Sequence, residues 1–273
     1  MGAGMSGPPP AELLRSLLDG PSRIAGAEWH ARVGSTNVVA ATAAARGAPE
    51  IHLVLADEQT AGRGRQGRAW QAPPGTSLML SLVTRPTVAA EHLTLLPLLT
   101  GLALAEAAGP HVPGVEVALK WPNDLLVRAG RAHAWRKAAG ILVEAVPGAA
   151  IVGLGCNVDW RGVERPPELA ARATSLAEAA GGPVDRWRVL AGFVGVFGRR
   201  YEAWQGQPVG FLDAYRSRCA TLGSGVRVER PRRDALQGRA VAVDDGGALH
   251  VRDAAGETVA VTAGDVVHVR PPR

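Results

Sequence analysis

Lysine and cysteine are both scarce in this chain of 273 residues. Its 30 basic residues include only two lysines, Lys120 and Lys137, and all the others are arginine. The two cysteines, Cys156 and Cys219, stand far apart in unlike contexts, which argues against a disulfide framework and against a Cys/His zinc cluster. No apolar run reaches the roughly 18 residues that a membrane span needs, and the N-terminus lacks the pattern of a signal peptide. These absences favour a cytoplasmic protein with reduced thiols and no membrane partner.

The composition is that of a folded protein with a basic surface. Hydrophobic residues make up 47% of the chain, the formal net charge is +5 and the sequence pI is about 10. Such a charge allows an acidic partner or a polyphosphate ligand. The arginines are spread along the chain rather than gathered in one segment, so the sequence does not indicate specific DNA binding. The length suits one large domain and a second, smaller one.

Strand-like and helix-like segments alternate over most of the chain. A polar triplet, Ser35-Thr36-Asn37, precedes an Ala-rich run and is typical of a helix start with side-chain caps, and Gly47 is suited to end that helix. One mixed sheet with packed helices, an α+β (α/β-type) catalytic domain, accounts for the pattern. Strands are expected from residue 28 and over 51–56, 77–83, 115–119, 124–128, 138–146 and 150–158. Helices are expected over 11–18, 38–46, 89–108, 187–204 and 208–220.

The character of the sequence changes after Gly223-Ser224-Gly225. Short alternating strands are expected over 226–228, 238–243, 248–251 and 266–269, and Asp244-Asp245-Gly246-Gly247 is typical of a hairpin turn. This pattern predicts a small antiparallel β-barrel of the SH3-like kind. We therefore expect an N-terminal extension over 1–26, a catalytic domain over 27–222 and the barrel over 223–273.

Residues 62–70 form a glycine–arginine loop with the sequence Gly-Arg-Gly-Arg-Gln-Gly-Arg-Ala-Trp. The glycines let backbone amides approach an anion, and the arginines offer forked donors that match phosphate or carboxylate oxygens. The loop is not a P-loop, because no Gly-Lys-Ser/Thr follows, and its third glycine is misplaced for a Rossmann fingerprint. A phosphate-binding loop and a flexible basic surface loop remain the two interpretations of the residues alone.

The two lysines open two further motifs. Lys120 begins Lys-Trp-Pro-Asn-Asp (120–124), and Lys137 precedes an apolar run over 138–144. In a chain that otherwise uses arginine, they indicate positions that require a compact ammonium. Asp124 could bind Mg²⁺, orient an amine or stabilise a turn. The strand end Gly153-Leu154-Gly155-Cys156-Asn157 suits close packing of a flat group, and simple tight packing explains it equally well.

The ordered set of motifs closely resembles the biotin protein ligases. The loop at 62–70 preceded by Asp-Glu-Gln-Thr-Ala (57–61), the motif at 120–124 and the run at 137–144 carry the resemblance, which covers residues 28–271. It implies a ligase that uses ATP and Mg²⁺ to convert biotin into biotinyl-5′-AMP and pyrophosphate. The biotinyl group then passes to a lysine of a biotin carboxyl-carrier protein domain of an acyl-CoA carboxylase.

The resemblance also implies roles for individual residues. Those implied to bind biotin are Ser35, Thr36, Asn37, Gln59, Arg63, Gly64, Arg65, Lys137 and Gly140. Those implied to bind ATP or the adenylate are Arg63, Arg65, Arg68, Trp70, Lys120, Asn123, Lys137 and Asn157. Those implied to act in catalysis are Lys137, Arg63, Arg65 and Asp124, of which Asp124 is also the expected Mg²⁺ ligand.

Three other functions compete with this interpretation. A lipoate or octanoate ligase has a related catalytic fold, but the full glycine–arginine loop argues against it. A biotin-responsive DNA-binding regulator needs a winged helix, for which the first 26 residues have no room, and a bare nucleic-acid-binding module is favoured only by the pI. We expect residues 1–26 to be removable with little effect. The connection over 128–136 is expected to be an extended hairpin.

Overall fold

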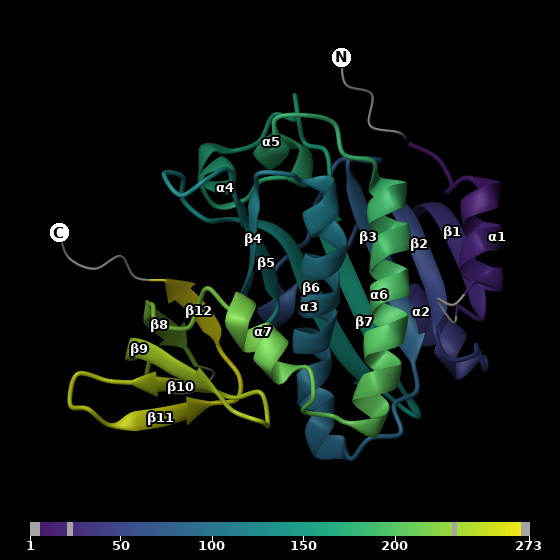
Figure 1. The fold of residues 1–273 in the computed structure, drawn as a ribbon. Helices are drawn as coiled ribbons and strands as arrows, with labels where there is room; N and C mark the ends of the chain where they lie inside the picture. The colour runs from purple at the N-terminus through teal and green to yellow at the C-terminus, as the bar shows by residue number, and fades with distance from the viewer. Residues whose placement is uncertain (1–5, 21–23, 231–233, 269–273) are drawn as a thin grey trace.

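A seven-stranded mixed sheet forms the centre of the protein (Figure 1). The structure is a computed structural model that describes residues 6–20, 24–230 and 234–268. The order across the sheet is β1-β2-β3-β7-β6-β5-β4; β1 and β2 are parallel, and every other neighbouring pair is antiparallel. The mixed sheet predicted from the sequence is thus confirmed. Its strands are β1 (Gly26–Val33), β2 (His52–Gln59), β3 (Ser77–Thr84), β4 (Glu116–Lys120), β5 (Asp124–Arg128), β6 (Arg136–Val146) and β7 (Ala149–Asn157).

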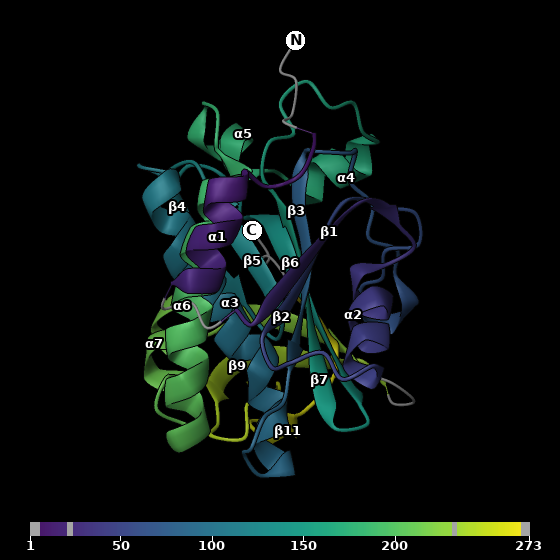
Figure 2. The same cartoon turned by 90° about the vertical axis from the view of Figure 1, so that its right-hand side faces the viewer.

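Helices cover both faces of this sheet, because its central strands are apolar on both sides. Leu53 and Leu55 of β2 face the larger core under α3 (Leu96–Ala108) and α6 (Arg186–Gly206). Val54 points the other way, into a small cluster with Ala40 of α2 (Thr36–Ala45). Figure 2 shows α2 on one side of the sheet, with the short α4 (Pro167–Arg172) above it, and α3 with α6 on the other side. The mostly uncovered face beside α2 leaves room for a cavity.

The helix expected over 89–108 is split. A 3-10 turn, η2 (Ala90–Leu95), precedes α3, and Pro97 occupies the first turn of α3, where its missing N–H costs nothing. Over the described residues, one helical stretch, Ala90–His111, is long and apolar enough to cross a membrane. It is the core helix: 67% of its apolar window is buried against the sheet and α6.

The N-terminal segment belongs to the same core. Helix α1 (Ala11–Asp19) packs on α6 and β1, and its Leu17, with Ile24 after it, is buried in the larger core. Removing such side chains exposes the surfaces they cover, at a cost of about 2–5 kcal/mol for each leucine or isoleucine. We therefore correct the expectation that the whole of residues 1–26 can be removed with little effect.

A five-stranded antiparallel sheet follows the larger unit. Its order is β11-β10-β9-β8-β12, so the small antiparallel domain predicted after residue 223 is confirmed, while Val269 of its last expected strand lies outside the described residues. Its strands are β8 (Gly225–Glu229), β9 (Leu236–Val243), β10 (Leu249–Arg252), β11 (Thr258–Val261) and β12 (Asp265–His268). Two short helices absent from the sequence prediction, α4 (Pro167–Arg172) and α5 (Leu176–Ala180), precede α6, and α7 (Leu212–Arg218) links the two units.

The small sheet is fixed to the larger unit by buried hydrogen bonds. The Trp121 indole N–H donates to the carbonyl of Gly247 over 2.9 Å, and Gly247 lies in the predicted hairpin turn, with φ +82°. Thr221 accepts a hydrogen bond from the Trp121 amide over 3.1 Å, and its hydroxyl lies 3.1 Å from Nε2 of His268 on β12. Since one hydrophobic cluster spans both sheets, the two units share a core.

We predict that His268 makes stability depend on pH. Burial, and secondarily the charge of Lys120, lower the pKa of His268 to about 4 from an ordinary value of 6.5. The unfolded chain therefore binds a proton more readily, and the stability should fall as pH drops from about 6.5 to 4. The loss should be roughly 1–2 kcal/mol after discounting the shift for partial exposure.

Urea unfolding at pH 7 and pH 4.5 measures this dependence. His268→Gln should flatten it, whereas His133→Gln at an exposed position should not. The same pH dependence in the His268→Gln variant as in the unaltered protein would refute the assignment.

Candidate active site

A cavity of about 300 Å³ opens on the α2 side of the sheet, over β6 and β7. It also receives the glycine–arginine loop and the N-terminus of α2, and Asp265 of the small sheet reaches it. All the site residues predicted from the sequence line this cavity except Lys120. The predicted residues that line it are Ser35, Thr36, Asn37, Gln59, Arg63, Gly64, Arg65, Arg68, Trp70, Asn123, Asp124, Lys137, Gly140 and Asn157.

Glycines form the floor of the cavity. In the register of β6 with β7, Gly140 pairs with Gly155 and Leu142 with Gly153. A Cβ atom added at Gly155 would lie 2.3 Å from the Trp70 ring, and one added at Gly153 would lie 2.1 Å from Oδ1 of Asn37. Since real Cβ atoms do not approach so closely, only glycine fits at these positions. The close packing predicted at 153–157 is confirmed, with the indole of Trp70 as the flat group that lies against it.

A buried polar network lies where α2 meets the sheet. Gln59 Oε1 accepts from the Thr36 amide over 2.7 Å and from the Thr36 hydroxyl over 3.1 Å. The Ser81 hydroxyl donates to Asn37 Oδ1 over 2.6 Å, and the Asn37 amide nitrogen donates to Glu144 over 2.6 Å. This network makes the triplet 35–37 more than a helix cap, and the expected capping bonds are not formed. Ser35 holds the N-cap position, but its side chain caps nothing in the described part of the chain.

Sequence reasoning missed Ser81 and gave no role to Glu144. Ser81 is completely buried in β3, whose residues are all buried and mostly apolar. A hydroxyl buried in such a strand must find a hydrogen-bond partner, which is the signal that could have pointed to it. Glu144 lies on β6, at the end of the motif that begins with Lys137, and its carboxylate also lies 3.3 Å from the Arg63 guanidinium.

Asp124 lies between the two lysines. Its Oδ1 is 2.6 Å from Nζ of Lys137, and its Oδ2 is 4.0 Å from Nζ of Lys120. The strand register explains the grouping, because Asp124 pairs with Lys120 on one side and with Gly140 on the other. Burial lowers the pKa of Lys120, and the neighbouring Asp124 opposes that shift. Lys120 thus acts on the cavity through Asp124 rather than by lining it.

The glycine–arginine loop is a tight hairpin that closes one side of the cavity. The Trp70 amide donates to the Gly62 carbonyl over 2.8 Å, and the Gly64 amide donates to the Arg68 carbonyl over 2.7 Å. The Arg65 guanidinium donates to Asn123 Oδ1 over 3.4 Å, and burial lowers its pKa. The loop therefore aims one of its arginines inward, beside the Lys120–Asp124 motif.

The small C-terminal sheet completes this wall. Arg68 forms an ion pair with Asp265 of β12, and Arg65 donates to the Gly264 carbonyl over 3.2 Å. Asp265 also lines the cavity. Sequence reasoning did not find it, because it lies almost two hundred residues from its partner and in no recognisable motif. The contact makes the second unit part of the site.

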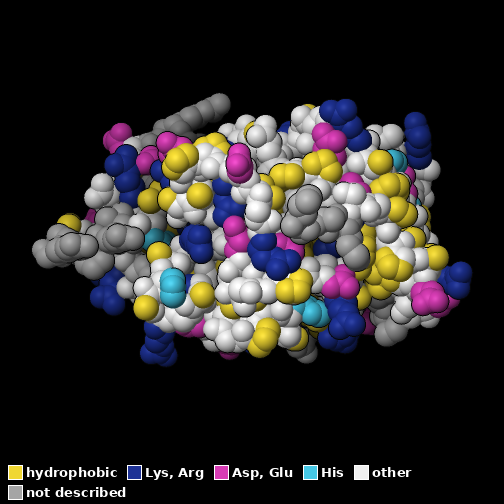
Figure 3. Space-filling model, turned by 90° about the horizontal axis from the view of Figure 1, so that it is seen from above, with side chains coloured by type: hydrophobic (Ala, Val, Ile, Leu, Met, Phe, Trp, Pro, Cys, Tyr) yellow, Lys and Arg dark blue, Asp and Glu magenta, His cyan; other side chains and the backbone are white. Residues whose placement is uncertain are grey.

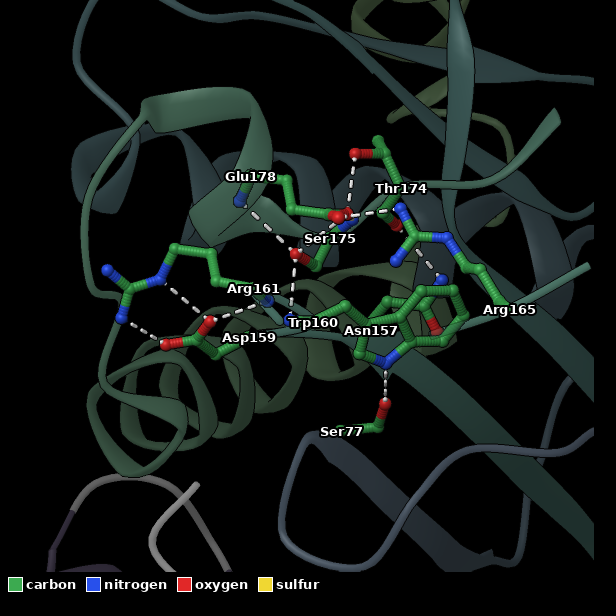
Figure 4. A network of polar contacts seen from close by, with 9 residues as sticks. All are labelled: Ser77, Asn157, Asp159, Trp160, Arg161, Arg165, Thr174, Ser175 and Glu178. Carbon is green, nitrogen blue, oxygen red and sulfur yellow. Dashed lines mark hydrogen bonds and ion pairs between the residues drawn. The ribbon is translucent and has the colours of Figure 1, made fainter. Parts of the chain in front are cut away.

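The chain after β7 forms the far wall, which a polar network supports (Figure 4). The Asn157 side chain, almost fully buried, donates to the Thr174 carbonyl over 3.0 Å, while its Oδ1 has no hydrogen-bond partner among the described residues. The Trp160 indole donates to Ser77 over 3.0 Å. Ser175 and Glu178 form a capping box that starts α5. The wall is thus held in place around Asn157 by hydrogen bonds within the chain after β7.

Two further expectations concern features outside the cavity. The connection over 128–136 is the predicted hairpin, with Arg128 stacked 4.3 Å from the ring centre of Trp135 and bonded to Glu116.

Both cysteines are buried and unpaired, and burial raises the pKa of Cys156 to about 12. No group of three or more potential metal-ligating side chains occurs within the described ranges.

Comparisons with known proteins agree with the motifs. Residues 30–160 match the Biotin/lipoate A/B protein ligase family, and residues 221–269 match the Biotin protein ligase C terminal domain. The chain is 38% identical to the biotin–[acetyl-CoA-carboxylase] ligase of Mycobacterium tuberculosis, over 94% of both chains. It is 35% identical to the ligase of the same name from Paracoccus denitrificans, over 84% of this chain and 95% of that one. The biotin protein ligase of Aquifex aeolicus in complex with biotin and ATP has a similar structure, with a TM-score of 0.77 and 27% identity over 90% of this chain and 99% of that one.

We predict that Asp265 keeps the glycine–arginine loop closed. Its ion pair with Arg68 is partly exposed and should contribute about 0.5–1 kcal/mol, so Asp265→Ala should open the loop roughly two- to fivefold more often. Limited trypsin digestion, followed at Arg65 and Arg68, measures the opening. Glu257→Ala, at an exposed position in the turn between β10 and β11 of the same unit, is the matched control. Equal cleavage rates in the two variants would contradict the proposal that the Asp265–Arg68 ion pair keeps the loop closed.

Proposed function

Because the chain belongs to the biotin/lipoate A/B protein ligase family, we propose a binding mode for biotin and ATP in the cavity over β6 and β7. The protein is an ATP-dependent biotin protein ligase that acts through biotinyl-5′-AMP. One observation carries the proposal: a single cavity joins a buried polar network to a cluster of cations. Asn157 lies four residues after Gly153, which is beside the network, and the span along β7 is about 13 Å. An extended ligand can bridge the two ends.

Biotin occupies the end near α2 in this proposal. Its fused ring carries a urea group, which needs both donors and acceptors, and the network of Thr36, Asn37 and Gln59 offers both. Leu142 and Leu154 supply apolar surface for the thioether ring and the aliphatic chain. Ser35 and Gly140, which also line the cavity, complete the biotin contacts expected from the resemblance.

The carboxylate of biotin then points toward Lys137 and the glycine–arginine loop. One carboxylate oxygen attacks the α-phosphorus of ATP, and the bond from that phosphorus to the bridging oxygen of pyrophosphate breaks. Negative charge increases on the phosphoryl oxygens, and Lys137, Arg63 and Arg65 neutralise it, with the Gly64 amide close by. This chemistry is mostly positioning and charge stabilisation. Lys137 can exchange its contact with Asp124 for one with the reacting oxygens.

The nucleotide takes the other end of the cavity. Asn157, with its unpaired Oδ1, is a suitable acceptor for an adenine amino group, and the Trp70 ring offers a stacking surface. Arg68 and Asn123 lie at the rim, where they can meet phosphate oxygens. Lys120 adds positive charge behind Asp124 without lining the cavity.

Mg²⁺ fits this site only as an ion that arrives with the phosphates. Asp124 is the expected carboxylate, and no cluster of three metal-ligating side chains surrounds it among the described residues. Mg²⁺ usually binds through one or two carboxylates together with phosphate oxygens and water, so a single Asp124 is enough. When bound, the ion would add positive charge beside the phosphates.

We propose as the acceptor a lysine of a biotin carboxyl-carrier domain of an acyl-CoA carboxylase, as the names of the relatives suggest. We further propose a cytoplasmic enzyme without a specific DNA partner. Figure 3 supports the absence of a specific DNA partner. On the face that it shows, the Lys and Arg side chains are interspersed with Asp and Glu rather than gathered into one basic surface. Incubation with ATP, Mg²⁺, labelled biotin and a carrier domain, with lipoate as the competing acid, tests the function. Transfer of lipoate instead of biotin would overturn the proposal.

We predict that Lys137→Arg slows adenylation by about 10- to 100-fold although the charge is kept. A guanidinium is larger and spreads its charge, so it cannot place one ammonium between carboxylate and phosphate. Pyrophosphate release in single turnovers measures the step. Lys120→Arg is the matched comparison and should be milder, because Lys120 does not line the cavity. A near-normal rate for Lys137→Arg would remove the role given to that lysine.

We predict that Arg65→Ala forms biotinyl-5′-AMP but releases it into solution. Arg65 ties the loop to Asn123 and to the Gly264 carbonyl, so its loss both removes a cation and loosens the closure that shields the mixed anhydride from water. Rapid filtration after a single turnover separates retained from released adenylate. Arg227→Ala, an exposed arginine on β8, should retain it. Retention of the adenylate by both variants would exclude the role of Arg65 in closing the loop over it.

A further inference from the structure

A buried ion pair lies close to the biotin end of the cavity but is not part of it. Arg186, the first residue of α6, places Nη1 2.7 Å from Oδ1 of Asp57, and their side chains are only 4% and 7% exposed. Asp57 lies on β2, two residues before Gln59. A pair this deeply buried stabilises a structure only when further hydrogen bonds satisfy its remaining polar atoms.

The N-terminal segment supplies such hydrogen bonds. The Gly7 amide donates to Asp57 Oδ2 over 2.6 Å, and Arg186 Nη2 donates to the Gly7 carbonyl over 2.9 Å. One residue, Gly7, fifty residues away from Asp57 in sequence, thus bonds to both partners of the ion pair through its backbone amide and carbonyl. Gly7 has φ +126°, a conformation that side-chain-bearing residues rarely adopt, so glycine is needed at this position. We call residues 6–10 the N-terminal clasp.

The clasp also touches a second segment that leads into the cavity. A Cβ atom added at Gly75 would lie 2.5 Å from the Ser6 hydroxyl, and the Gly75 amide donates to the Asp57 carbonyl over 3.4 Å. The next residue, Thr76, accepts at its carbonyl from the amides of Val158 and Asp159, just after β7. The clasp therefore contacts the end of β2 and the turn before β3 together.

We propose that the N-terminal clasp positions Gln59 for biotin binding. Asp57 and Gln59 lie two residues apart at the end of β2, so a contact that fixes Asp57 also limits the movement of the strand end that carries Gln59. Because the clasp holds Asp57, the end of β2 keeps Gln59 Oε1 within hydrogen-bond distance of the Thr36 amide and hydroxyl. Gly7, Asp57 and Arg186 are then positioning residues, since none of them lines the cavity. This inference rests on the proposed placement of biotin at Gln59.

Deletion of residues 1–10 tests the clasp, and deletion of residues 1–5 is the matched control. The longer deletion leaves α1 and the buried Leu17 in place, so the core keeps its cover. We expect it to weaken biotin binding, measured by calorimetry without ATP, by about tenfold, the usual effect of losing a hydrogen bond to a charged group. The KM for ATP should change by less than about twofold, and the shorter deletion should leave both values unchanged.

A point variant separates positioning from general loss of structure. Gly7→Pro removes the N–H that donates a hydrogen bond to Asp57, and proline requires φ near −65° where Gly7 has a positive φ. Pro8→Ala, at an exposed neighbouring position, is the control. Weaker biotin binding in Gly7→Pro but not in Pro8→Ala, at an unchanged KM for ATP, supports the proposal. Normal biotin binding in both Gly7→Pro and the longer deletion, or equal losses for biotin and ATP with a lower Tm, overturns it. Failure of the intact protein to bind biotin would instead reject the proposed function.

Discussion

The cavity depends on the direct pairing of one glycine with another in the middle of the sheet. Because Gly140 and Gly155 face each other across β6 and β7, no side chain rises from that part of the floor. The indole of Trp70 rests on the bare backbone, and the rest of the glycine–arginine loop follows it into place. A single methyl group on this floor would push the indole outward, and with it the arginines that the chemistry requires.

The loop in turn connects the central sheet with the small sheet beside the cavity. Through Arg65 it meets Asn123 of the central sheet and Gly264 of the small sheet, and through Arg68 it meets Asp265. The small sheet is itself fixed by Trp121, which directly follows Lys120. The site is therefore assembled from three contacting elements, and the position of each constrains the other two.

Much of this arrangement could be predicted from the sequence, since the chemistry is carried by unusual residues at recognisable spacings. The apolar runs predicted the central strands, and the two lysines in an arginine-rich chain drew attention to the motifs at 120–124 and 137–144, the first of which contains Asp124. The helices α4 and α5 were missed although Ser175 and Glu178 have the spacing of a capping box, a local signal that was present. Ser35 was expected to cap α2 because hydroxyl residues usually do so at helix starts. In this fold the neighbouring Thr36 and Asn37 bond across the sheet instead.

Other features could not be predicted, because they arise only when distant segments meet. Asp265 pairs with an arginine almost two hundred residues away, and Gly7 with a carboxylate fifty residues away. Neither contact has a periodicity or a motif that marks it. Ser81, which the sequence analysis missed, is intermediate, since a hydroxyl in an apolar strand could have indicated a buried partner but not which one.

The scarcity of lysine has a consequence for an enzyme of this kind. An acyl adenylate reacts with any accessible primary amine, and the protein that makes it is the nearest target. Here the side chains offer only Lys120 and Lys137, and both lie beside Asp124, in or next to the cavity. Arginine carries nearly all the positive charge of the outer surface, and a guanidinium does not accept an acyl group under such conditions. Adenylate that leaves the cavity therefore meets arginine rather than lysine over the rest of the chain.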